Sequence, residues 1–153
     1  MILIAGIGNV FLGDDGFGPE VARRLAAGAP LPDGTRVADY GIRGLHLAHD
    51  LLAGYDTLIL IDALPGDGTP GRVEVLEVDP SGAGAGELDG HGMDPLAVLA
   101  AVARLGGTLP VTYVVGCRIG AVDEGIGLSA PVRAAVPEAV AAVHALLRAP
   151  VRG

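Results

Sequence analysis

The stretch MILIAGIGNVFLGDDGFGPEVARRL, residues 1–25, decides the fold class of this chain. Its apolar start predicts a buried strand over residues 2–6. A glycine-rich loop follows the strand, and a proline in the first helical turn then predicts a helix over residues 19–28. In α/β folds, loops at the carboxyl ends of strands are where ligands bind. The first loop is therefore a candidate position for the functional site.

This loop offers two acids and one amide, and it holds no basic residue. Asp14 and Asp15 are adjacent, and Asn9 is the only asparagine in the chain. A phosphate cradle would need the opposite charge, so the loop fits a metal ion or a positioned water better. Asn9 is equally compatible with a simple turn, because asparagine tolerates left-handed backbone.

The rest of the chain alternates between strand and helix patterns. Residues 57–63, TLILIDA, are apolar on both faces, which predicts a central strand. Residues 72–78 alternate charged and apolar side chains, as in an edge strand that can run antiparallel. The alternation predicts an α/β fold with helices on both faces of a mostly parallel sheet of about five strands. The other expected strands cover residues 35–40 and 110–117, and the other helices cover 44–53, 95–105 and a region from a Ser129 cap to about Arg148, with a kink or restart at Pro137.

Composition narrows the classes of function. The 153 residues are expected to form one domain, residues 1–153, and half of them are hydrophobic. The net charge of −8 disfavours nucleic acid and anionic membrane surfaces as partners. Cys117 is the single cysteine, which excludes an internal disulfide, and we interpret it as a small buried hydrophobe. The chain shows neither a signal peptide nor a long enough apolar run for a membrane span, so we expect a cytoplasmic protein.

Three possible metal ligands lie at the ends of separate elements. Asp15 is in the first loop, Asp62 ends the central strand, and His91 lies in a glycine-rich loop before the helix over 95–105. If the first and third strands are parallel neighbours, Asp15 and Asp62 share one rim of the sheet. Two carboxylates and an imidazole suit zinc or nickel and leave coordination positions open. Asp39 ends the second strand at the same rim, where it is a candidate general base.

Other interpretations remain open at this point. Each of these acids also suits a plain turn or cap, and a histidine in a glycine-rich loop is often only solvated. His46 and His49 are spaced to share a helix face, but we interpret them as surface or core histidines. A nucleotide-binding enzyme is a weaker alternative, because the first loop does not fit the spacing G-x-G-x-x-G.

Several segments carry a specific resemblance. They are GIGNVFLGDDGFGPEV after the first strand, DYGIRGLHL at 39–47, LILIDAL at 58–64, GHGMDPLAVL around the loop histidine, and GIGLSAPV at 125–132. In order and spacing, this set resembles the nickel–iron hydrogenase maturation endopeptidases. The resemblance implies a three-layer α/β/α sandwich with a mostly parallel twisted sheet. It also implies a peptidase that removes the C-terminal extension of the hydrogenase large subunit precursor.

The resemblance further implies roles for individual residues. The family's metal contacts fall on Asp15, Asp62 and His91, and its activity-linked acid falls on Asp39, so the expected catalytic acids are Asp15, Asp39 and Asp62. The metal is nickel, carried by the substrate rather than permanently bound, and it serves as a recognition element. We expect the enzyme to act as a monomer. The alternative is a nickel-handling chaperone that binds the precursor without cleaving it.

The chain departs from the family pattern at two places. Some members have Glu where this chain has Asp15. Where many members read Gly-Gly-Thr after the second-strand acid, this chain has Tyr40-Gly41-Ile42. Any role of that threonine hydroxyl is lost here, which leaves the substrate subclass open.

Overall fold

The fold is known from a computed structural model, which describes residues 1–66, 68–78, 95–120, 122 and 124–148. Strands and helices alternate along most of the chain, as the sequence predicts. In chain order the elements are β1 (Ile2–Ile7), the short 3-10 helix η1 (Gly13–Gly16), α1 (Phe17–Ala27), β2 (Thr35–Gly41), α2 (Gly44–Leu51), β3 (Thr57–Pro65), β4 (Val73–Val78), α3 (Pro95–Arg104), β5 (Val111–Ile119) and α4 (Ala130–Arg148).

The five strands form one sheet in the order β2-β1-β3-β5-β4. Four strands are parallel, and β4 pairs antiparallel with β5 at one edge. The antiparallel edge strand expected from the alternating pattern is therefore confirmed. In β4 the side chains of Val73 and Val78 pack inward, while Glu74 reaches the guanidinium of Arg118 on β5.

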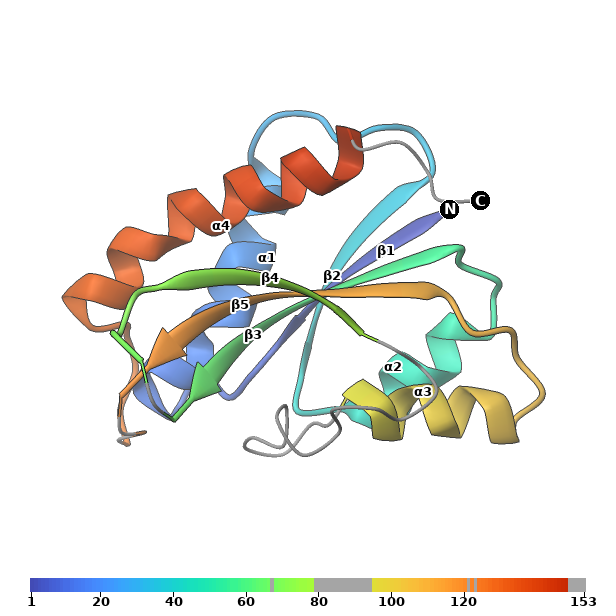
Figure 1. Cartoon of the computed structure of the whole chain (residues 1–153), viewed down its shortest axis with the longest axis horizontal. Coiled ribbons are helices and arrows are strands. Elements are labelled where there is room, and N and C mark those ends of the chain that lie inside the picture. Colours follow the sequence, from blue (N-terminus) through green and yellow to red (C-terminus); the bar gives the residue numbers. More distant parts are fainter. Residues whose placement is uncertain (67, 79–94, 121, 123, 149–153) are drawn as a thin grey trace.

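Helices cover both faces of the sheet (Figure 1), which confirms the expected α/β/α sandwich. Helices α1 and α4 lie together on one face, and α2 and α3 lie together on the other. Strand β3 contributes to both cores because successive side chains point to opposite faces. Its Leu58 and Leu60 join the α2–α3 core, whereas Ile59 and Ile61 join the α1–α4 core.

Helix α4 continues through Pro137, so the restart that the sequence suggested as an alternative to a kink does not occur. Buried residues on both sides of the proline hold the helix on the sheet, among them Val132, Val136 and Val143. Among the described residues, α4 is also the one helix long and apolar enough to cross a membrane by length and composition. Its buried stripe packs against α1 and β5, which gives part of this apolar character a role within the fold.

Helix α1 begins at Phe17, two residues earlier than predicted, and its first turn is packed tightly onto the sheet. A β-carbon at Gly18 would overlap the carbonyl oxygens of both Ile7 and Ile61. Only glycine allows the helix to approach β1 and β3 so closely.

Replacing Gly18 with alanine therefore tests this packing. We expect Gly18→Ala to lower the free energy of unfolding by about 2 kcal/mol or more, because the sheet backbone must move. Gly120→Ala is the matched control, since the nearest atom to a β-carbon there is 4.0 Å away. Its expected effect is within about 0.5 kcal/mol. Equal urea denaturation midpoints for the two variants would contradict the close approach.

Candidate active site

Asp15 is held in place by the backbone of the first loop. The residue lies in η1 and is only 3% exposed. Its Oδ2 accepts a hydrogen bond from the backbone N–H of Asn9 at 2.9 Å. The Asn9 side chain meanwhile accepts from the N–H of Phe11, also at 2.9 Å. Asn9 therefore acts as a turn residue that shapes the loop around Asp15.

Asp62 lies near the end of β3 and is half-buried. Its Oδ1 accepts a hydrogen bond from the N–H of Ala63 at 2.8 Å. Burial raises the pKa of Asp62 well above the ordinary value of 3.8, and the nearby Asp15 carboxylate raises it further. None of the ion pairs between described residues involves either acid. A cation between them would relieve both the repulsion and part of the desolvation cost.

The sheet register explains why Asp15 and Asp62 lie near each other. Gly6 near the end of β1 pairs with Ile61 of β3 on one side and with Asp39 of β2 on the other. The loop after β1 thus places Asp15 beside the end of β3. The shared rim predicted for Asp15 and Asp62 is confirmed as a placement, and their roles as ligands or catalysts stay predictions.

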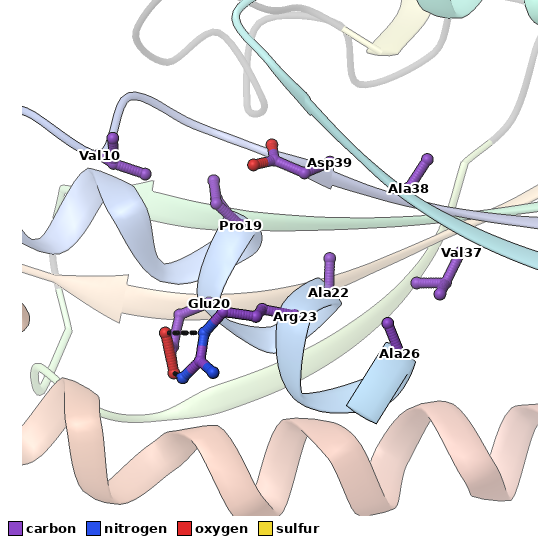
Figure 2. Close-up of a pocket in the computed structure, with 9 residues that line it drawn as sticks. All are labelled: Val10, Pro19, Glu20, Ala22, Arg23, Ala26, Val37, Ala38 and Asp39. Atoms are coloured by element: carbon purple, nitrogen blue, oxygen red, sulfur yellow. Dashed lines mark hydrogen bonds and ion pairs between the residues drawn. The ribbon is translucent and has the colours of Figure 1, made fainter. Parts of the chain in front are cut away.

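Asp39 lies on the far side of β1 from Asp62. It is exposed, and its Oδ1 accepts a hydrogen bond from the N–H of Gly41 at 2.8 Å. Asp39 also lines a groove of about 350 Å³ between β2 and α1 (Figure 2). The carboxylate is therefore open to a ligand or to water lying in that groove.

The third predicted metal ligand, His91, lies outside the described residues. Among the residues that are described, no group of three His, Cys, Asp or Glu side chains gathers closely enough to hold a metal ion. His46 and His49 are exposed, and His46 approaches Asp50 at 3.9 Å. Their interpretation as surface histidines is confirmed.

The loop that carries Asp15 is braced from the opposite end of the chain. The N–H of Gly13 donates to the carbonyl of Gly125 at 2.7 Å, and the N–H of Gly125 donates to the carbonyl of Phe11 at 2.9 Å. Asp14 accepts hydrogen bonds from the backbone N–H and the hydroxyl of Ser129, at 2.6 and 2.8 Å. Asp14 thus anchors the start of α4. The sequence predicts Ser129 as a cap, but no local pattern links Ser129 to Asp14, 115 positions away.

Cys117 is buried in the α1–α4 core, as interpreted from the sequence. Burial raises the pKa of its thiol to about 11, so the thiol stays protonated near neutral pH. A thiolate nucleophile is therefore not available at this position.

Comparison with known proteins agrees with this geometry. The family model described as hydrogenase maturation protease matches residues 19–146. This chain belongs to the hydrogenase maturation protease family. The resemblance noted from the sequence motifs is confirmed, and the family match favours a peptidase over a nucleotide-binding enzyme.

Individual relatives cover most of the chain. It is 32% identical over 150 residues to the hydrogenase expression/formation protein HupD of Rhizobium leguminosarum bv. viciae, covering 96% of this chain and 74% of the relative. It is 34% identical over 149 residues to HupM of Azotobacter chroococcum, covering 95% and 71%. The solved structure of the hydrogenase maturating endopeptidase HybD from E. coli superposes with a TM-score of 0.81 at 28% identity, covering 96% and 91%.

The Asp62 environment of this protease predicts a gain in stability when its charge is removed. The Asn side chain of Asp62→Asn keeps the acceptor for Ala63 and cannot ionise beside Asp15. We therefore expect the variant to be more stable than the wild type at pH 7, as measured by urea unfolding.

The gain should depend on pH in a definite direction. Because the folded pKa of Asp62 is raised, the unfolded chain ionises first as pH rises above 3.8, and the native state loses stability. The advantage of Asp62→Asn should accordingly shrink as pH falls toward 4. Asp33→Asn, at an exposed loop position, is the control and should show no such trend. A gain that is absent at pH 7, or that grows at low pH, would contradict the raised pKa.

The Asp14–Ser129 contact makes a separate prediction. Asp14→Ala removes both acceptors at the start of α4, so we expect it to cost about 1 kcal/mol of stability. Asp33→Ala should cost less than about 0.5 kcal/mol. Thermal melting followed by circular dichroism compares the two, and equal melting temperatures would refute the anchoring role of Asp14.

Proposed function

We propose that this protein is the endopeptidase that removes the C-terminal extension from a nickel-loaded hydrogenase large subunit precursor. The observation that carries the proposal is the pair formed by Asp15 and Asp62. Two neighbouring carboxylates in a partly buried site are unfavourable without a cation, and a divalent ion brought by the substrate would stabilise them. Placement of these acids at the ligand-binding rim of the sheet supports this use.

Asp15, Asp62 and His91 are the side chains that we propose contact the substrate's nickel. Carboxylate and imidazole donors suit this ion, and three protein ligands leave room for groups of the substrate. A precursor without nickel lacks the ion that links it to the two acids. Cleavage would therefore wait until nickel insertion is complete.

Hydrolysis itself needs a water molecule and a proton acceptor. Asp39 is exposed at the rim and can accept the proton as water adds to the scissile carbonyl carbon, after which the proton passes to the leaving amine. Asp15 and Asp62 would hold the substrate's nickel, and the bound ion would supply polarisation of the carbonyl or of the water. We assign the three acids these catalytic roles, which do not require a serine or cysteine nucleophile.

Intact-mass analysis of the precursor tests this function. Incubation with the protein should remove a C-terminal peptide from the nickel-loaded precursor and leave a matched nickel-free precursor intact. Retained binding without cleavage would instead indicate a nickel-handling binding protein. Equal cleavage of both forms would show that the protein is a peptidase whose activity does not depend on nickel in the precursor.

The acids should contribute differently to the rate. We expect Asp62→Asn and Asp39→Asn each to slow cleavage by at least about 100-fold, the lower range for a lost general base. Asp39→Asn should still bind the nickel-loaded precursor, because the proposed nickel contacts remain. Asp33→Asn is the control and should cleave at the wild-type rate. A wild-type cleavage rate in Asp39→Asn would show that Asp39 is not the general base.

A further inference from the structure

The groove beside Asp39 runs from the rim of the sheet along α1. Pro19, Ala22 and Ala26 point from α1 toward β2, and Figure 2 shows them opposite Val37 and Asp39. The residues that line the groove are Val10, Pro19, Glu20, Ala22, Arg23, Ala26, Val37, Ala38 and Asp39. Most of these side chains are small, so space remains between the helix and the strand. Glu20 and Arg23 pair with each other on the helix side.

Strand β2 is an edge of the sheet, and half of its backbone groups point away from β1. The N–H of Ile2 in β1 donates to the carbonyl of Gly34 at 2.8 Å, so the backbone groups of Gly34 face β1. In the residues of β2 that follow, the backbone groups point alternately away from β1 and toward it. The N–H and C=O of Val37 and Asp39 therefore point outward. The guanidinium of Arg43 donates a hydrogen bond to the Asp39 carbonyl oxygen at 3.1 Å. Among the described residues, no hydrogen bond outside the pairing of the strands uses the N–H or C=O of Val37.

An exposed strand edge beside a helix is a setting in which extended peptides bind. The added peptide pairs its main chain with the edge, and its side chains lie against the helix. Ala26 follows Pro19 by seven positions, which at 1.5 Å per residue gives a groove of about 10 Å. That length matches about three residues of extended chain.

The position of the groove indicates which peptide it takes. One end lies at Asp39 and Val10, at the rim where the proposed reaction takes place. Because Asp39, the proposed general base, lines this end of the groove, a substrate chain whose scissile bond lies at Asp39 can extend into it. Its walls of Ala, Val and Pro side chains suit small apolar residues.

We propose that the edge of β2 binds about three residues of the precursor, next to the scissile bond, as an added strand. The backbone of Val37 pairs with the peptide, while Pro19, Ala22 and Ala26 select small side chains. This inference rests on the proposed function, because the occupant is the substrate of that reaction. It makes Ala26 and Val37 determinants of sequence specificity in addition to the three acids.

Two neighbouring alanines give a matched test. Ala26 and Ala27 are both exposed on the last turn of α1, but only Ala26 lines the groove. We expect Ala26→Leu to fill the groove and raise KM for the nickel-loaded precursor at least about tenfold, with kcat within about twofold. Ala27→Leu should leave both constants unchanged. Equal melting temperatures of the two variants would confirm that each is folded.

A second variant tests the backbone pairing. Proline is tolerated on edge strands where its missing N–H faces outward. Val37→Pro should therefore keep the fold and raise KM in the same way as Ala26→Leu. Wild-type KM in Ala26→Leu overturns the groove inference while cleavage by the wild type upholds the proposed function. If the wild-type protein cleaves no nickel-loaded precursor, the proposed function fails and the inference fails with it.

Discussion

The candidate site depends on how closely the first loop and the start of α1 pack onto the sheet. Gly8 has a positive φ of 144°, and a β-carbon there would overlap the carbonyl oxygen of Asp15. Gly18 lets the first turn of α1 lie against the ends of β1 and β3. With no side chain at either position, η1 packs against the rim beside β3, the strand that carries Asp62. A larger residue at either glycine would separate the two carboxylates.

This packing places two like charges in a partly buried setting, which lowers the stability of the fold. The same arrangement favours the binding of a cation. The remainder of the structure offsets this loss of stability. Apolar cores on both faces of β3 fix the strand that carries Asp62. The contact between Asp14 and Ser129 joins the first loop to α4. Loss of stability at a functional site, balanced by rigid surroundings, is the usual arrangement in enzymes.

Local patterns in the sequence were enough to predict the strands, the helices and the antiparallel edge. The fully apolar run around Leu60 identified the central strand, and the alternation in residues 73–78 identified β4. Parallel pairing then placed Asp15 and Asp62 together. The Asp14–Ser129 contact spans 115 positions, so no local pattern reveals it. The continuity of α4 through Pro137 also depends on tertiary packing. The groove between α1 and β2 arises from small side chains on separate elements, which a linear sequence does not bring together.

The most direct test of the central claim is an NMR titration of the Asp62 side-chain carboxyl in the wild-type protein and in Asp15→Asn. If the fold holds the two acids together in a partly buried site, Asp62 titrates well above its ordinary pKa in the wild type. Removing the Asp15 charge should lower that pKa part of the way, because burial remains. An ordinary pKa for Asp62 in the wild type, unchanged in Asp15→Asn, would contradict the pairing on which the proposed nickel contact rests.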